Sequence, residues 1–100
     1  MAFIVVYKPL ALLEAKEAYD WYAQNHINMQ SVFLEQLERT DRFLAANPYL
    51  YPCVEQTIRR ANLNQFPYAL FYVIDEDTVN VLSCFHQSRK PKVGGNDFAV

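Results

Sequence analysis

Glycine is nearly missing from this sequence. The chain of 100 residues has only two glycines, both in the segment "VGGNDFAV", whereas apolar residues make up 52% and aromatic residues 15% of it. This much apolar surface can offset the entropy lost on ordering the chain, which excludes a disordered protein. The length suits a single core. We therefore expect one domain over residues 1–92 and a loose tail over residues 93–100, where no periodicity is visible.

Cysteine and histidine are also scarce, with two of each in the chain. Cys53 and Cys84 form no CxxC pair, so we expect reduced, buried thiols and no disulfide. His26 and His86 have no cysteine or carboxylate at the spacing of metal ligands, which argues against a metal site. No motif indicates a cofactor.

Long hydrophobic runs are absent too. No apolar stretch approaches the roughly 20 residues that a membrane helix needs. The segment "MAFIVVYKPL" lacks the basic region, the long apolar run and the small-residue cleavage site of a signal peptide, and it is more typical of a first strand. We therefore expect a cytoplasmic protein with no membrane contact.

An excess of positive charge is the last feature that the sequence lacks. Nine basic residues against eleven acidic ones give a net charge of −2. Proteins that grip nucleic acid usually carry a basic excess, because phosphate contacts supply most of the affinity. Sequence-specific DNA binding by this chain alone is therefore not expected. The concentrated positive charge lies late in the sequence, at Arg59, Arg60, Arg89, Lys90 and Lys92.

The apolar pattern has a helical period in the first half and a period of two in the second. Strands are expected over residues 3–8, 55–63, 68–74 and 79–87, and helices over residues 10–25 and 29–46. The faces predicted to be buried are Ala11, Ala15, Ala18 and Tyr22 in the first helix, and Phe33, Leu37, Thr40 and Leu44 in the second. Together they predict an α+β fold: a strand, a helical hairpin, and a three-strand meander in a mostly antiparallel sheet, with the hairpin packed on one face.

Strand alternation assigns side chains to the two faces of this sheet. In residues 79–87 it places Asn80, Leu82, Cys84 and His86 on one face, and Val79, Val81, Ser83, Phe85 and Gln87 on the other. Arg59 and Arg60, being adjacent, must point to opposite faces. Tyr68 and Tyr72 share a face and could line a groove. The aromatic group of Trp21, Tyr22, Phe66, Tyr68, Phe71 and Tyr72 is better explained as core packing than as base stacking.

Several segments, in this order and spacing, resemble the RelE/ParE superfamily of bacterial toxins from type II toxin–antitoxin systems. They are "EAYDWY", "FLEQLERTDRFLAANPYLYP" and "IRRANLNQFPYALFYVIDEDTVNVLSCFHQSRKP". The resemblance spans roughly residues 3–91 and is nearest to the ParE-like, plasmid-stabilisation branch. It implies a strand–helix–helix–three-strand fold, and a growth-inhibiting toxin whose sheet and groove bind the C-terminal segment of a cognate antitoxin protein.

The superfamily holds two activities, between which the residues must choose. RelE-like members cut messenger RNA in the ribosomal A site, whereas ParE-like members block DNA gyrase. The RelE-like nucleases place an arginine in a segment resembling "YRLVY"; this chain has "YALFY", with Ala69 at that position. Losing one preorganised charge donor typically costs on the order of 10²–10³ in rate. The catalytic candidates that remain are His86, Arg89 and Arg60.

The sequence thus favours a non-enzymatic, ParE-like toxin that binds an antitoxin and, when free, an essential target. The first alternative is a metal-free, ribosome-dependent mRNA interferase that uses His86 and Arg89 with an arginine of the first meander strand. The second is an inactivated member that serves as an antitoxin-binding module. The residues expected to contact the antitoxin or the target are Arg59, Arg60, Tyr68, Tyr72, His86, Arg89 and Lys90. A purely structural role also stays open, with His86 capping the sheet and Arg89 pairing with an acidic residue such as Glu55.

Overall fold

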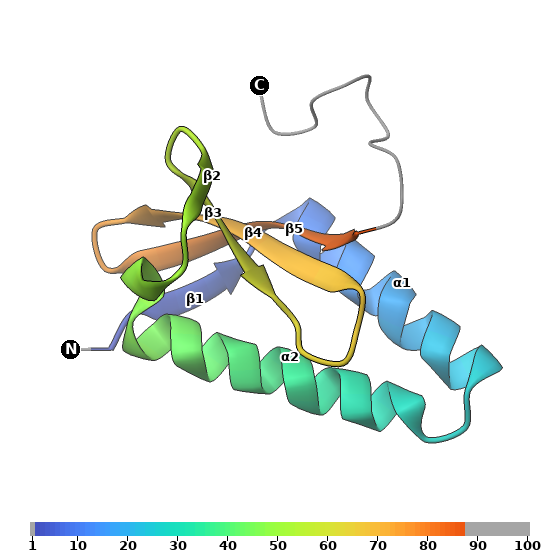
Figure 1. Ribbon diagram of the computed structural model, residues 1–100. Coiled ribbons are helices and arrows are strands. Elements are labelled where there is room, and N and C mark those ends of the chain that lie inside the picture. The colour runs from blue at the N-terminus through green and yellow to red at the C-terminus, as the bar shows by residue number, and fades with distance from the viewer. Residues whose placement is uncertain (1, 88–100) are drawn as a thin grey trace.

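A five-stranded sheet with two helices on one of its faces makes up residues 2–87, the part of the chain that the computed structural model describes (Figure 1). In chain order the elements are β1 (Ile4–Tyr7), α1 (Pro9–Asn25), α2 (Met29–Ala46), a short 3-10 helix (Pro48–Leu50), β2 (Cys53–Glu55), β3 (Ile58–Asn62), β4 (Tyr68–Asp75) and β5 (Thr78–His86). The strands lie in the order β1-β5-β4-β3-β2. Only β1 and β5 pair in parallel; the other neighbouring strands are antiparallel. The predicted α+β fold is confirmed.

The helical hairpin agrees closely with the sequence pattern. Pro9 stands in the first turn of α1, where its fixed φ and missing N–H cost the helix nothing. Asn28 adopts a left-handed φ of 70°, which lets the chain reverse before α2 begins. The buried faces are the predicted ones: Ala11, Ala15, Ala18 and Tyr22 in α1, and Phe33, Leu37, Thr40 and Leu44 in α2. Neither of these described helices is long and apolar enough to cross a membrane.

The predicted bounds of the first meander strand are wrong. Residues 55–63 were expected to form one strand, but the chain reverses at Gln56, whose φ is 50°, and makes a hairpin of β2 and β3. The sheet therefore gains a short edge strand, β2, that alternation alone did not predict. The prediction that both thiols are buried is wrong for the same region: Cys53, on β2, is exposed, whereas Cys84 is buried.

A β-bulge in β5 overturns the predicted faces of that strand. Phe71 pairs with Ser83 but Tyr72 pairs with Val81, so Leu82 is an extra residue in the ladder. The insertion reverses the alternation, and Cys84 joins Val79 and Val81 in the core on the helix side. Phe85, which was predicted to share a face with Val79 and Val81, packs instead with Leu82 against the cluster on the opposite face, which we call the open face. Beyond the bulge His86 pairs with Tyr68, whose ring belongs to the helix-side core.

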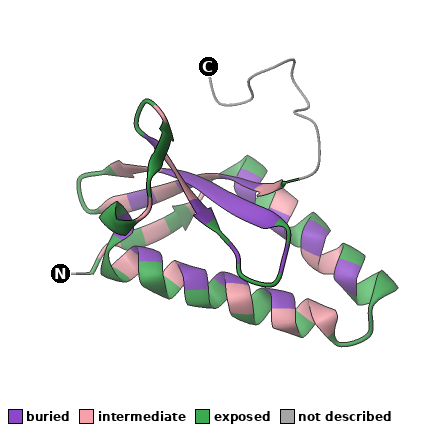
Figure 2. Ribbon diagram, viewed as in Figure 1, coloured by how far each residue is buried: buried purple, intermediate pink, exposed green. Residues whose placement is uncertain are grey.

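The buried residues lie where the sheet and the hairpin face each other (Figure 2), and many members of this core are aromatic. Tyr22 stands 5.0 Å from Phe66 and 5.5 Å from Phe33 between ring centroids, and Phe33 is 5.5 Å from Tyr68. Most of these pairs meet edge to face, an arrangement that adds about 0.5–1.5 kcal/mol each beyond the area they bury. The predicted tail over residues 93–100 lies outside the described residues.

Candidate functional site

Arg59 and Arg60 lie on opposite faces of the sheet, as adjacent strand residues must. Arg59 pairs with Tyr72 and so points toward the helices, whereas Arg60 pairs with Phe71, a residue of the open face. Arg59 donates from Nη1 to the carbonyls of Tyr51 at 2.5 Å and Tyr49 at 3.3 Å. Its Cζ also lies 5.4 Å from the centroid of the Tyr49 ring. Arg59 therefore fastens the segment between α2 and β2 to the sheet.

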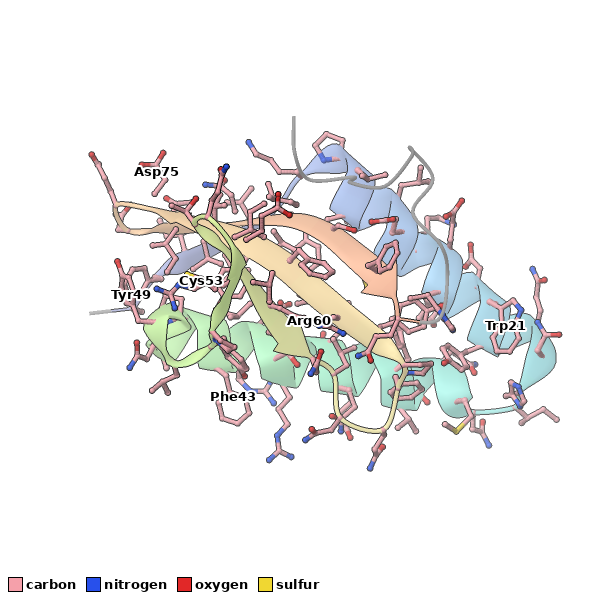
Figure 3. The ribbon with its side chains drawn as sticks, turned by 45° about the horizontal axis from the view of Figure 1, so that its top comes forward. Trp21, Phe43, Tyr49, Cys53, Arg60 and Asp75 are labelled. Atoms are coloured by element: carbon pink, nitrogen blue, oxygen red, sulfur yellow. The ribbon has the colours of Figure 1, made fainter. Side chains whose placement is uncertain are left out.

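Arg60 is held on the open face by Phe71 of β4 and by Asn62 of its own strand, β3 (Figure 3). Its Cζ lies 5.7 Å from the centroid of the Phe71 ring, and its Nε donates to Oδ1 of Asn62 at 3.0 Å. The same oxygen accepts a hydrogen bond from Nε2 of Gln87 at 3.2 Å. This arrangement holds the guanidinium against an aromatic ring, and within residues 2–87 one of its three nitrogens donates a hydrogen bond.

The rest of the open face is apolar. Ile58, Ala69 and Phe71 form a buried cluster there, and Val73, Leu82 and Phe85 pack against it with part of each side chain exposed. Ala69, where RelE-like nucleases are expected to have an arginine, places a fully buried methyl group in this cluster. The face can therefore supply apolar contact with a partner, with the charge of Arg60 beside it.

A cleft opens on the helix side of the sheet, at the end of α1. Its volume is about 380 Å³, and it is lined by Trp21, Tyr22, His26, Pro67, Tyr68 and His86. The ring of Tyr68 lies 4.9 Å from that of His86, and the ring of Trp21 lies 5.2 Å from that of His26. Trp21, the chain's single tryptophan, is 47% exposed, which is a large exposed fraction for a tryptophan side chain. Both histidines of the chain thus line one cleft.

A second concave surface lies between the two helices, on the side away from the sheet. It is lined by Leu12, Ala15, Lys16, Tyr19, Phe33, Leu34 and Leu37 and has a volume of about 220 Å³. Leu12 is 61% and Leu34 is 41% exposed, so the groove has apolar rims that water reaches. Apart from Lys16, no charged side chain lines it. We call this surface the interhelical groove.

The structure separates the sequence-predicted site residues into several groups. His86 and Tyr68 meet in the cleft, whereas Arg60 is on the other side of the sheet. Tyr72 is fully buried, and its hydroxyl donates to the carbonyl of Pro48 at 2.6 Å. Arg89 and Lys90 lie outside the described residues. Within residues 2–87, no group of three or more metal-ligating side chains comes together.

Trp21 and His26 line the cleft but were not predicted as site residues. Nothing in their local sequence marks them, because the cleft joins the end of α1 to β4 and β5, which are distant in the chain. An exposed tryptophan beside a histidine could be noticed only after the helix had been placed against the sheet. Only the tertiary structure therefore identifies these two residues as part of the cleft.

Titratable groups buried under the helices have shifted pKa values. The hydroxyl of Tyr7 donates to Oδ1 of Asp41 at 2.7 Å. Burial raises the pKa of Asp41 to about 6, although the hydrogen bond from Tyr7 opposes this shift. Burial, with the nearby carboxylates of Glu14 and Asp41, raises the pKa of Cys84 to about 12. The Cys84 thiol therefore stays protonated and is not a nucleophile at neutral pH.

Comparisons with known proteins agree with this architecture. The model of a family described as "ParE toxin of type II toxin-antitoxin system, parDE" matches residues 5–91. No curated protein sequence matches the chain. A solved structure described as "Chromosomal ParDE TA system from P. aeruginosa" has a TM-score of 0.73 at 11% identity, covering 85% of this chain and 96% of that one. "The structure of YoeB dimer from Staphylococcus aureus" has a TM-score of 0.54 at 16% identity, covering 84% and 95%. At these identities, the structural likeness establishes the fold alone.

Proposed function

Because the chain belongs to the ParE toxin family of type II toxin–antitoxin systems, we propose that it arrests growth by binding an essential target, without cutting it, until an antitoxin neutralises it. DNA gyrase is the target that the resemblance to ParE-like toxins suggests. The antitoxin partner follows from the family, and the mode of action is our proposal.

The observation that carries the non-cleaving mode is the separation of Arg60 from His86 by the sheet. RNA cleavage without a metal needs a proton acceptor, a proton donor and cations around one phosphate. His86 lies in the cleft on the helix side, whereas Arg60 lies on the open face beside the methyl group of Ala69. Within residues 2–87, these candidates do not converge on one site.

Three surfaces favour binding as the activity: the cleft, the interhelical groove and the open face. The cleft has an exposed tryptophan in a concave aromatic setting, and tryptophan is the residue type most enriched among side chains that dominate protein–protein binding energy. We assign the cleft to the target. The interhelical groove and the open face are more apolar, and an antitoxin segment that orders on binding needs apolar area to offset its lost entropy. We assign these two surfaces to the antitoxin.

Induced expression of the chain without its antitoxin tests the mode of action. We expect growth arrest, accumulation of gyrase-trapped DNA breaks and induction of the SOS response. Primer extension on total RNA from the arrested cells should show no new cuts at ribosomal A sites. New A-site cuts would replace the proposal with the mRNA interferase, and absence of arrest would favour the inactivated, antitoxin-binding module.

Co-expression with the product of the neighbouring small reading frame tests neutralisation. We expect growth to recover and the two proteins to purify together through a tag on either one. Failure of that product both to bind and to restore growth, in cells that the toxin arrests, would contradict its role as the antitoxin.

A further inference from the structure

The guanidinium of Arg60 is fixed in place but has capacity left for a ligand. Asn62 accepts from Nε, and neither terminal nitrogen of Arg60 has an acceptor within residues 2–87. A guanidinium with both terminal nitrogens available presents the parallel fork that matches a carboxylate. We propose that Arg60 binds a carboxylate of the antitoxin, in a segment that lies on the open face. This inference rests on the proposed function and names the chemistry of its antitoxin contact.

Arg60 is supported by hydrogen bonds that run through Asn62 to Gln87. The side chain of Gln87 donates from Nε2 to Oδ1 of Asn62 at 3.2 Å and to the carbonyl of Tyr68 at 3.4 Å. The backbone N–H of Gln87 donates to the carbonyl of Pro67 at 2.7 Å. Asn62 is thereby oriented from the end of β5, and Arg60 is oriented by Asn62. A preorganised side chain loses less entropy on binding, so a carboxylate contact here gains more affinity than at a mobile arginine.

The surroundings of Arg60 select a protein segment over nucleic acid. Val73, Leu82 and Phe85, each only partly buried, give the open face an apolar surface, which suits apolar side chains next to the bound carboxylate. At the end of β4 the exposed residues Asp75, Glu76 and Asp77 follow in succession. Their charges would repel a phosphate backbone that continued along the strand from Arg60. The ligand we infer is an acidic residue flanked by apolar ones.

Arg59 does not compete for this role, although it is adjacent. Its Nη1 is already shared between the carbonyls of Tyr49 and Tyr51, on the opposite face. The two arginines therefore have separate tasks, and only Arg60 is expected to respond to the partner.

The test is the affinity of the full-length toxin for the full-length antitoxin identified by the co-expression experiment, measured by calorimetry or by surface plasmon resonance. Arg60→Lys keeps the charge and loses the fork, and we expect it to weaken binding by roughly 10-fold or more. Arg42→Lys is the matched control, because Arg42 is exposed on α2, away from the open face. Its affinity should stay within about 2-fold of the wild type, as for a residue outside the interface.

A second variant keeps the proposal testable should Arg60→Lys misfold. Asn62→Asp changes an exposed side chain and places a carboxylate against Arg60 within the toxin itself. We expect it to weaken antitoxin binding while the melting temperature is retained. In a double-mutant cycle, one antitoxin Asp→Asn or Glu→Gln substitution should lose its effect when combined with Arg60→Lys.

The outcomes separate this inference from the proposed function. Wild-type affinity in Arg60→Lys or in Asn62→Asp, both shown to be folded, would overturn the carboxylate contact and leave the antitoxin partnership intact. If these variants instead lost self-association or RNA binding while antitoxin affinity held, the occupant of the open face would be a second copy or RNA, and the inference would again be wrong. Failure of the wild type itself to bind the antitoxin would overturn the proposed function.

Discussion

Ser83 donates a hydrogen bond from its hydroxyl to Oε1 of Glu14, 2.6 Å away, across the junction between β5 and α1. The same oxygen accepts the backbone N–H of Cys84 at 3.0 Å. The register of β1 with β5 ends where Tyr7 meets Val81, so the outer edge of β5 continues past its partner strand. Glu14 takes the place of the missing strand there. A carboxylate outside the apolar stripe of α1 thus joins the helix to the sheet beside the bulge.

Glu14→Ala should destabilise the fold by about 1–3 kcal/mol, because it leaves the buried Ser83 hydroxyl and the Cys84 N–H without their acceptor. Glu17→Ala, an exposed position on the same helix, is the control and should shift stability by less than about 0.5 kcal/mol. The free energy of unfolding from urea titration is the measurement. Equal effects of the two substitutions would mean that the Glu14 contacts add nothing to stability.

Asp41 should make the fold less stable as the pH rises from about 4 to about 6. Burial raises its pKa from the ordinary 3.8 to about 6 in the folded protein, so the folded state holds a proton that the unfolded state has released. Its contribution to stability is fully present below the unfolded pKa and is lost as the pH rises through the folded pKa. Asp41→Asn should remove this loss, and its unfolding free energy should fall less than that of the wild type over the same pH range.

The control for Asp41 is Glu17→Gln, which alters an exposed carboxyl group and should keep the wild-type pH dependence. Tyr7→Phe should have the opposite effect, because the hydrogen bond from Tyr7 lowers the pKa of Asp41. Without this hydrogen bond the pKa of Asp41 rises further, so the decline in stability should extend to higher pH. An Asp41→Asn variant with the wild-type pH profile would show that another group is responsible.

The elements that sequence predicts well are those set by local periodicity. The stripe from Ala11 to Tyr22 repeats at the helical period, and no distant contact is needed to identify it. The reversal at Gln56 was missed because a left-handed φ at a residue other than glycine or asparagine has no strong local signal. The extra residue Leu82 was missed because a bulge is a feature of strand pairing, and alternation within one strand cannot reveal it.

The same reason explains the partial prediction of the site. His86 and Arg60 could be identified as candidates from residue type, yet their placement on opposite faces depends on the bulge and on the strand register. Trp21 reached the cleft only through packing of α1 on the sheet. The sequence therefore identified which residue types could act in a site, whereas it did not show which of them lie close together in the fold.

Tyr72 should act in folding and not in antitoxin binding. Its hydroxyl is buried and donates to the carbonyl of Pro48 at 2.6 Å, which ties the 3-10 helix to β4. Tyr72→Phe leaves that carbonyl without its donor, and we expect a loss of about 1–3 kcal/mol in unfolding free energy. Tyr49→Phe, at an exposed hydroxyl, is the control and should be nearly neutral. Antitoxin affinity of folded Tyr72→Phe should match the wild type; a specific loss would place Tyr72 in the interface.

Trp21 and His86 should be needed for growth arrest and dispensable for antitoxin binding, because the cleft is the surface that we assign to the target. Trp21 is half exposed, and removing an aromatic anchor at an interface centre typically costs 2 kcal/mol or more, about 30-fold in affinity. Trp21→Ala and His86→Ala should each raise the expression level needed for arrest. The measurement is colony formation against induction, with toxin levels quantified.

Gln24→Ala serves as the control for these cleft variants, since Gln24 is exposed on α1 and does not line the cleft. It should arrest growth as the wild type does. Tryptophan fluorescence gives an independent measurement, because Trp21 is the chain's single tryptophan. Its emission should shift when the purified target is added to the wild type. Full toxicity of both cleft variants at wild-type protein levels would move the target contact away from the cleft, to a surface such as the open face, where Arg60 could then be tested in the same assay.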